Sequence, residues 1–439
     1  MLLLVAAVVT AACSYSTTGR FFNQIAVGVG AAAVLFVVLT GWQHHVRRRT
    51  VVLAVAISVA VQLYKPPIGN VQRVWGFHGV LVLTALATLA IAVLVLLPPG
   101  RRKLPGTWLT MVVLGLTELA IVAWSHRPEI DVWQIFQQAS AGLLHGINPY
   151  VISYTDIPTG QTATCFNYLP ATFLSAWPGW AVFDDARYSE VAVLLLGWAV
   201  LARTLVSRGR TGRRGDALIL LALAMSLTGT LRVAQQAWNE SLLLGFLLLG
   251  TCALFTGRTA WAVVLFALAL ATKQHIALLL PVLAMWPQFG LRRTAYSAGL
   301  AAAVSAPWFF ANPGRFKGCT VDFFVHGVAR FDSISLWHFL PSPIAPAVPV
   351  LALLAAYWLV HRRIARTPAG LLIGCAVVLY AFDLFNKQSF ENQWWFVSEL
   401  LVCGLAFSAA GVPNRDDAWH AGAASAAPDQ SSRTGISSE

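Results

Sequence analysis

Apolar runs of about the length that crosses a lipid bilayer recur along most of this chain, and they constrain its fold more than any other feature. The clear runs are residues 24–40, 77–97, 107–124, 186–206, 240–256, 295–311, 343–360, 368–384 and 395–410. Shorter runs occupy residues 2–13, 50–63, 216–231, 259–272 and 275–290. A transmembrane helix needs roughly 20 apolar residues, and a helix satisfies its own backbone hydrogen bonds in lipid. The runs therefore predict an all-α, polytopic membrane protein with 13 to 14 transmembrane helices.

The charges lie between these runs. Only 11% of the residues are charged, against about 25% in soluble domains. The formal net charge of +12 would suggest nucleic-acid binding in a soluble chain if it formed one patch. The basic residues instead form short clusters typical of cytoplasmic loops. These clusters are Arg47–Arg49, Arg101–Lys103, Arg208–Arg214, Arg292 with Arg293, and Arg362 with Arg363. We expect a multi-pass protein of the plasma membrane that contacts membrane lipids and no nucleic acid.

Alternation from the basic clusters places three loops outside, at 125–184, 312–342 and 385–394. Residues 167–182 are apolar enough to cross, but a crossing there would turn the arginine-rich 208–214 loop outward. We therefore expect this stretch to lie against the outer interface, packed on protein. Residues 1–411 form a single transmembrane domain in this interpretation. The tail at 412–439 has almost no large apolar residues and is expected to be disordered in the cytoplasm.

The first outer loop predicts an amphipathic helix that begins just after a transmembrane helix. Val132, Ile135, Phe136, Ala139 and Leu143 recur at helical spacing, and the glutamines between them take the other face. A helix end follows, since glycine, asparagine and proline lie within residues 146–149. The helix starts at Asp131, where an aspartate is a good N-cap. Capping is compatible with a chemical function for the same carboxylate.

Cysteines also mark the outer loops. Cys165 and Cys319 fall on the two large ones, where an oxidising exterior permits a disulfide. Two unpaired thiols fit the sequence equally well. The other four cysteines lie within or beside apolar runs, as small packing residues.

Several motifs together resemble the integral-membrane GT-C glycosyltransferases. The first outer loop carries an acid just after a span, then Gly-Ile-Asn-Pro-Tyr at 146–150 and Phe-Asn-Tyr-Leu-Pro at 166–170. The pattern continues with Gln-Gln-x-x-Asn at 235–239 and Ala-Thr-Lys-Gln-His at 271–275. The closest group is the bacterial polyprenyl-phosphate-mannose-dependent alpha-mannosyltransferases. The resemblance covers roughly residues 125–400 and is carried by pattern rather than by long identity.

The resemblance implies a GT-C-like fold with juxtamembrane helices in the first outer loop, and an extracytoplasmic active site. It implies transfer of a hexose, with mannose first, from a polyprenyl-phosphate donor to a lipid-linked or cell-wall glycan acceptor. The lipid-linked sugar phosphate is then a substrate, and no cofactor or metal is implied. Such a transfer needs an acid to take the acceptor proton and cations to hold the phosphate. By resemblance Asp131 is the general base of an inverting transfer, with Glu129 as the second candidate.

Lys273 is the best-placed phosphate-binding cation, although a lysine that snorkels to the interface would look the same. The predicted donor-phosphate set is Lys273, His275, Arg315, Lys317 and Arg330. The predicted substrate-binding set is Tyr150, Tyr168, Gln236, Asn239, His326, Lys387, Glu391, Asn392 and Trp394. The last outer loop departs from the mannosyltransferase pattern, which favours a Ser-Trp-x-His-His segment there. This departure leaves the sugar open.

Two other classes of function stay open. Glu118 and Glu399 lie inside apolar runs, where ionisable groups also serve transporters. The alternative is therefore a transporter or flippase of lipid-linked sugars, and an inactive assembly partner with the same fold is a third. Polar residues concentrate on the outer loops rather than inside the spans, and this distribution favours the enzyme.

Overall fold

The computed structural model describes residues 2–17, 28–33, 47–64, 74–97, 103–128, 130–155, 165–327, 329–330, 333–340 and 344–412. Helices make up all the regular elements of these residues, and no strand occurs among them. The predicted all-α class is confirmed. Glu129, most of the predicted span at 24–40 and the tail beyond Val412 lie outside the described residues.

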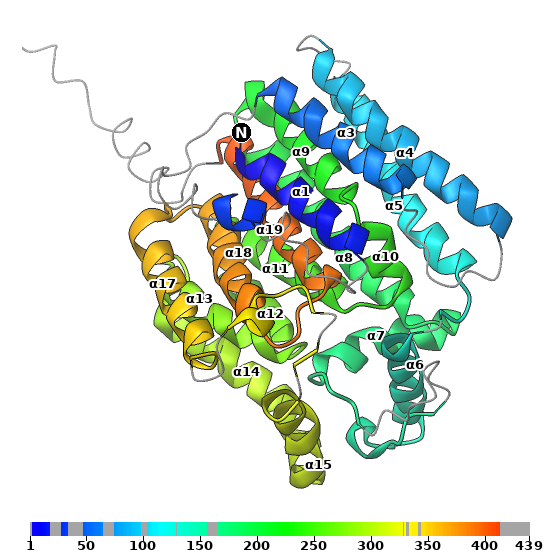
Figure 1. Ribbon diagram of the computed structural model, residues 1–439, viewed down its shortest axis with the longest axis vertical. Coiled ribbons are helices and arrows are strands. Elements are labelled where there is room, and N and C mark those ends of the chain that lie inside the picture. Colours follow the sequence, from blue (N-terminus) through cyan, green and yellow to red (C-terminus); the bar gives the residue numbers. More distant parts are fainter. Residues whose placement is uncertain are drawn as a thin grey trace, which may run out of the picture.

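Most predicted apolar runs correspond to helices of one bundle (Figure 1). The longer helices are α1 (Leu2–Thr17), α3 (Arg48–Tyr64), α4 (Val74–Leu96), α5 (Lys103–Trp124), α8 (Arg187–Arg208), α11 (Glu240–Phe255), α14 (Gly290–Ala311), α17 (Ala347–Arg363), α18 (Pro368–Phe385) and α19 (Glu391–Ala410). The shorter ones are α6 (Asp131–Leu144), α7 (Ala171–Phe183), α9 (Arg214–Met225), α10 (Thr230–Gln235), α12 (Thr259–Leu270), α13 (Leu280–Met285), α15 (Pro313–Lys317) and α16 (Phe323–Val325).

Five of the described helices are long and apolar enough to cross a membrane. They are the apolar stretches of α4, α5, α8, α18 and α19. Shorter apolar helices lie at Leu3–Tyr15, Glu240–Phe255, Thr259–Leu270 and Gln274–Met285. The chain is therefore a helical protein with several segments suited to a bilayer.

Two predicted spans are interrupted rather than continuous. The run at 216–231 is divided into α9 and α10, and Gly229 between them has a φ of 105°. Glycine adopts such a φ without steric cost, so the helix breaks there. The run at 275–290 begins as a 3₁₀ helix over Gln274–Leu279 before α13. Hydropathy averaged over a window did not reveal these breaks, because it reports apolarity and not backbone conformation.

Helices α18 and α19 form the centre of the bundle. α19 is buried from Glu391 through Phe407, whereas Leu83, Leu86 and Leu89 on α4 are exposed. In a membrane protein such an apolar outer face meets lipid. Helices α8 and α11 approach closely, since a Cβ on Gly197 would lie 3.0 Å from the Cα of Gly245. Small residues at such a contact let two helices pack tightly.

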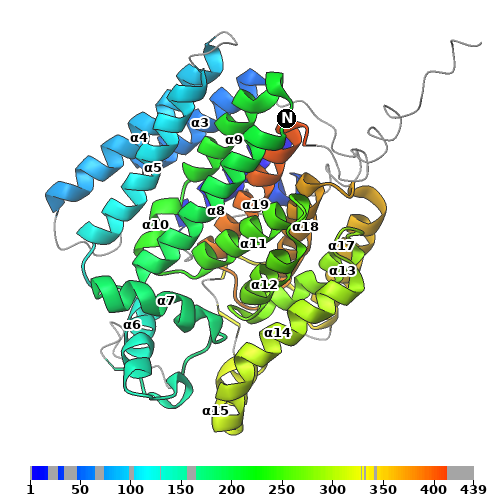
Figure 2. The same ribbon diagram turned by 180° about the vertical axis from the view of Figure 1, so that it is seen from behind.

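Helices α6, α7 and α15 project from one end of the bundle (Figures 1 and 2). The apolar face predicted for α6 is largely correct, because Ile135, Phe136 and Ala139 are buried. Two glutamines of the other face hold the surrounding loop. The Gln137 amide donates to Asp184 O at 2.8 Å, and the Gln138 amide donates to Thr155 O at 2.7 Å. The loop is thus a packed structure on the end of the bundle.

A fully buried arginine joins this loop to the bundle. The Arg187 guanidinium, at the start of α8, pairs with Asp185 through Nε–Oδ1 at 2.9 Å and Nη2–Oδ2 at 2.5 Å. Its Nη1 donates to Ser125 Oγ at 2.7 Å and to Gln235 O at 2.9 Å. Trp133 Nε1 of α6 donates to Asp185 Oδ1 at 3.3 Å. One ion pair therefore connects α5, α6, α8 and α10.

We expect Arg187→Met to destabilise the protein by about 3–5 kcal/mol, because the change leaves the Asp185 carboxylate and several carbonyls without their donor. Thermal unfolding of the detergent-solubilised protein measures the effect. Lys317→Ala is the control, since the Lys317–Asp322 pair is mostly exposed and such pairs contribute about 0–1 kcal/mol. If the two variants unfolded at the same temperature, the conclusion that Arg187 stabilises the junction between the loop and the bundle would be wrong.

Candidate functional site

An ion pair marks the end of the bundle that carries α6 and α7. Lys273 lies between α12 and the following 3₁₀ helix, and its Nζ is 2.5 Å from Glu240 Oε1 at the start of α11. The Glu240 side chain is fully buried, and that of Lys273 is 12% exposed. A buried carboxylate needs a partner of opposite charge. The pair therefore holds a cation that remains accessible from one side.

Tyr168 lies beside Lys273 and is within the electrostatic influence of Asp131. Lys273 Nζ is 5.7 Å from the centre of the Tyr168 ring, which is cation–π distance. Burial raises the pKa of the Tyr168 hydroxyl well above its usual value, and the charges of Asp131, Glu240 and Glu190 raise it further. The structure thus brings the candidate base and the candidate phosphate-binding lysine to the same tyrosine.

Asp131 is the first residue of α6, and Ile130 occupies the N-cap position. The predicted N-cap function of Asp131 is therefore wrong by one residue. Its Oδ1 accepts a hydrogen bond from Val132 N at 2.9 Å, and the side chain is exposed. An acid in the first turn still interacts favourably with the helix dipole. The exposed carboxylate remains open to a second molecule.

The turn that carries Lys273 is held by both large loops. Leu169 N donates to Thr272 O at 3.1 Å, and Ala171 N donates to Ala271 O at 2.8 Å. The Gln274 side-chain amide donates to Asn167 O at 3.0 Å and to Thr320 O at 3.1 Å. Because these bonds come from residues far apart in the sequence, they set the position of Lys273 relative to both loops.

Buried polar atoms without hydrogen-bond partners among the described residues occur on Glu240, on the residue before it and on Asp383. Asn239 precedes Glu240 and is 1% exposed, and neither its amide nitrogen nor its oxygen has a hydrogen-bond partner among the described residues. The same holds for Glu240 Oε2 and Asp383 Oδ1. Asp383, near the end of α18, interacts electrostatically with Lys273 and Glu240. Asn239 was predicted as a site residue, whereas Glu240 and Asp383 were not.

A signal for the two missed acids was present in the sequence. Glu240 and Asp383 each lie at the edge of an apolar run, where an acid is costly unless it has a function or a partner. Arg232 was also missed. Its Nε is 2.8 Å from Glu391 Oε1, so Glu391 is a counter-ion at the start of α19. The neighbouring candidates Gln236 and Asn392 are buried at 6% and 8% exposure.

Three other candidates hold the architecture of the site. Tyr150 is fully buried, and its hydroxyl donates to Tyr168 O at 2.8 Å. Trp394 is also buried, and its Nε1 donates to Ile334 O at 3.1 Å. Lys387 Nζ donates to Val325 O at 3.0 Å, which joins the second and third outer loops. Each of these three side chains therefore donates a hydrogen bond to a backbone carbonyl and positions the segment that carries it.

The remaining cations lie mostly on the second outer loop. Lys317 pairs with Asp322 at 2.8 Å, and the Arg330 guanidinium stacks 4.6 Å from the centre of the Phe390 ring. Arg315 and His326 are exposed on the same loop. His275 is half-buried, and its ring lies parallel to that of Phe382 with centroids 6.1 Å apart. Of this set, His275 is the sequence neighbour of the Lys273–Glu240 pair.

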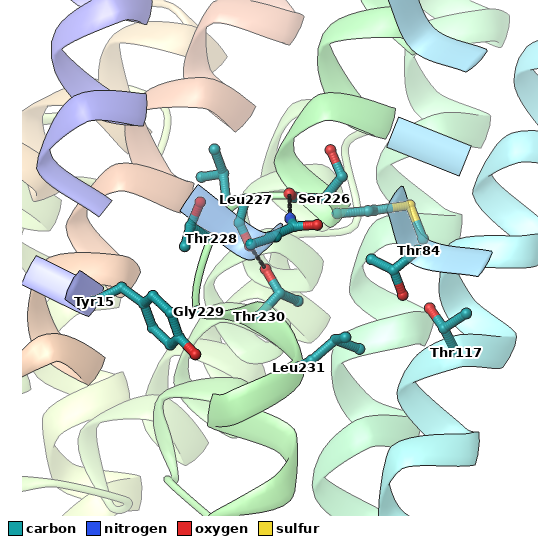
Figure 3. Close-up of a pocket in the computed structure, with 11 residues that line it drawn as sticks. Tyr15, Thr84, Thr117, Ser226, Leu227, Thr228, Gly229, Thr230 and Leu231 are labelled. Carbon is teal, nitrogen blue, oxygen red and sulfur yellow. Dashed lines mark hydrogen bonds between the residues drawn. The ribbon is translucent and has the colours of Figure 1, made fainter. Parts of the chain in front are cut away.

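A separate polar cavity lies at the break between α9 and α10 (Figure 3). The side chains of Thr84 and Thr117 lie beside each other on one side, and Tyr15 lies on the other. Its volume of about 10 Å³ is close to the space that one water molecule needs. The cavity is too small for a sugar or a lipid headgroup.

Comparison with known proteins yields no relative: no protein family, no curated protein and no solved structure matches this chain. Function must therefore be argued from the site itself.

The two loop cysteines are not joined by a disulfide, and their thiols lie next to each other. A hydrogen bond with the Cys165 thiol raises the pKa of the Cys319 thiol, and burial raises this pKa further, by a smaller amount. Cys319 is also near Tyr150 O, with Sγ at 3.9 Å. The thiols therefore meet where the two large loops meet, and a disulfide between them stays a prediction.

We expect the two-electron oxidant diamide to join Cys165 and Cys319, because the two thiols are already in contact. Peptide mapping by mass spectrometry under non-reducing conditions detects the linked peptides. Cys252 and Cys375, which are buried in α11 and α18, serve as controls that stay reduced. If Cys165 and Cys319 both remained open to alkylation after oxidation, the contact between the loops would be wrong.

Proposed function

We propose that this protein is a polytopic membrane hexosyltransferase with a GT-C-like architecture of 13 to 14 crossings. It takes a hexose, with mannose as the first candidate, from a polyprenyl phosphate and transfers it to a lipid-linked or cell-wall glycan. The observation that carries the proposal is that Lys273 Nζ lies 5.7 Å from the centre of the Tyr168 ring while the charge of Asp131 acts on the same tyrosine. An exposed acid and a partly exposed cation at one place match the two requirements of sugar transfer from a phosphate.

The chemistry assigned to this site is a single displacement. The acceptor hydroxyl oxygen forms a bond to the anomeric carbon while Asp131 takes the hydroxyl proton. The bond between that carbon and the phosphate oxygen breaks, and the phosphate leaves with the electron pair. Lys273 stabilises the charge that develops on this oxygen. The configuration at the anomeric carbon is inverted, and no covalent enzyme intermediate forms.

The position of the charges along α8 supports an active site on the outer face of the plasma membrane. The helix begins at Arg187, beside the loop that carries Asp131, and ends at Arg208, where a basic cluster follows. Basic loops stay on the cytoplasmic side during insertion. If α8 crosses the bilayer once, Asp131 and the Lys273 turn face the exterior.

Buried acids keep the transporter or flippase as a second candidate. Glu118 in α5 and Glu399 in α19 are fully buried, and neither carboxylate oxygen of Glu118 has a hydrogen-bond partner among the described residues. Acids of this kind mark proton or substrate pathways in transporters. We favour the enzyme because both the Lys273–Glu240 and the Arg232–Glu391 ion pairs lie where α11 and α19 begin, near the outer loops.

We expect Asp131→Asn to lower the rate of hexose transfer by about 10²–10⁴-fold, because the amide cannot accept the proton. The assay follows glycolipid formation from a polyprenyl-phosphate hexose by the purified protein in lipid nanodiscs. Asp184→Asn is the matched control, since Asp184 is exposed on the same loop at a positive φ that asparagine also tolerates.

Full turnover by the Asp131→Asn variant would exclude Asp131 as the base. The flippase would be favoured if lipid-linked sugar crossed the bilayer of proteoliposomes and neither the wild type nor the Asp131→Asn variant formed a new glycosidic bond.

A further inference from the structure

A phosphate that binds Lys273 must compete with the carboxylate of Glu240, which already pairs with this lysine. The carboxylate of Glu240 already occupies Lys273 Nζ at 2.5 Å, and Asp383 adds a second acid that interacts with the same lysine. The charge of Asp131 also acts on Tyr168, the tyrosine whose ring Lys273 contacts. Like charges at short range repel strongly where water is excluded. An incoming anion must therefore displace Glu240 from the lysine.

The geometry allows this exchange. Lys273 is 12% exposed, whereas Glu240 is fully buried. An anion can therefore reach Lys273 more readily than it can reach Glu240. A lysine side chain has four rotatable bonds and can turn toward the new partner. Glu240 is the first residue of α11, so the helix fixes its backbone and only its shorter side chain can turn.

The atoms left behind are suited to hydroxyl groups. Asn239 and Asp383 are each 1% exposed, and both carry side-chain atoms without hydrogen-bond partners, as does Glu240. Each buried polar atom without a partner costs about 1–3 kcal/mol, so a native protein seldom keeps several together. A carboxylate accepts from a hydroxyl group, and a carboxamide both donates and accepts. The cluster therefore has the chemistry of a polyol site.

We propose that Glu240 is a resident counter-ion that the donor phosphate displaces from Lys273, and that Glu240, Asn239 and Asp383 then bind hydroxyl groups of the donor sugar. This inference rests on the proposed function and names the residues that select the sugar. It makes the donor a hexose with free hydroxyl groups, which the cluster recognises while Lys273 holds the phosphate. Displacement and sugar binding are coupled, because the phosphate that displaces Glu240 carries the sugar whose hydroxyl groups replace the ammonium.

The test compares two probes, farnesyl phosphate and farnesyl-phosphate mannose, with the full-length protein in lipid nanodiscs and calorimetric measurement of Kd. Glu240→Gln should bind farnesyl phosphate about tenfold more tightly than the wild type, a difference of about 1.4 kcal/mol, because the amide does not compete for Lys273. Asn239→Ala should leave farnesyl phosphate affinity within about twofold, and Asp383→Asn should leave it unchanged or raise it, because that change removes a negative charge that acts on Lys273. Both variants should weaken farnesyl-phosphate mannose relative to farnesyl phosphate about five- to tenfold.

Two further variants keep the result interpretable. Asp184→Asn removes a negative charge from the same end of the molecule without touching the cluster, so both affinities should stay unchanged. Glu240→Gln leaves Lys273 without its acid and can lower stability. Glu240→Asp keeps the charge on a shorter side chain, and we expect it to fold and to bind farnesyl phosphate with an intermediate affinity. Thermal unfolding of each variant confirms folding.

The outcomes separate this inference from the proposed function. If Lys273→Gln weakened both probes and Glu240→Gln left farnesyl phosphate affinity unchanged or lower, displacement of Glu240 would be overturned while the phosphate site stood. Equal weakening of both probes by Asn239→Ala and Asp383→Asn would overturn the sugar site. If Lys273→Gln changed neither affinity, the phosphate-binding function of Lys273 would fail, and with it the inference that rests on it.

Discussion

Removal of charge from water is the constraint on which the end of the bundle that carries α6 and α7 depends. A charged side chain in a low-dielectric interior needs a partner of opposite charge and further hydrogen bonds. Arg187 meets this need with Asp185, Ser125 and Gln235, and each of these contacts comes from a different segment. The network positions the start of α8 against α5, α6 and α10. The first outer loop, with Asp131 at its beginning, is therefore fixed relative to the bundle.

The same constraint organises the candidate site. Lys273 and Arg232 each pair with an acid that begins a long helix, Glu240 of α11 and Glu391 of α19. Arg187 satisfies its donors within the protein, but Glu240 keeps an oxygen without a partner, as does the neighbouring Asp383. A network that is fully satisfied stabilises a fold, whereas a partly satisfied one has capacity for a ligand. This difference distinguishes the structural pair at Arg187 from the candidate functional pair at Lys273.

Much of the fold follows from local pattern. The apolar runs predict the helices because a bilayer-length apolar segment has few alternatives to a helix. The spacing of the apolar residues in α6 predicts its buried face, because residues three or four apart lie on the same side of a helix. The breaks at Gly229 and at Gln274–Leu279 did not follow from hydropathy, since a break depends on backbone conformation rather than on apolarity. Tyr150 and Trp394 show a related limit. An aromatic residue in a polar loop suits either ligand binding or internal packing. The side chains of Tyr150 and Trp394 are both buried, which is internal packing.

The sequence by itself determined that this protein is helical, that it has segments suited to a bilayer, and that acids and bases concentrate near the ends of particular helices. Asp131, Lys273 and Asn239 are candidates that the resemblance to GT-C glycosyltransferases implies, and their functions stay predictions. Only the tertiary structure decided which charges meet. Lys273 pairs with an acid 33 residues away, and Asp383 reaches the same place from a helix more than a hundred residues farther along. The physical reason is that a local pattern reflects the interactions of one segment with its solvent. The pairing of charges depends on which helix ends the packed bundle brings together.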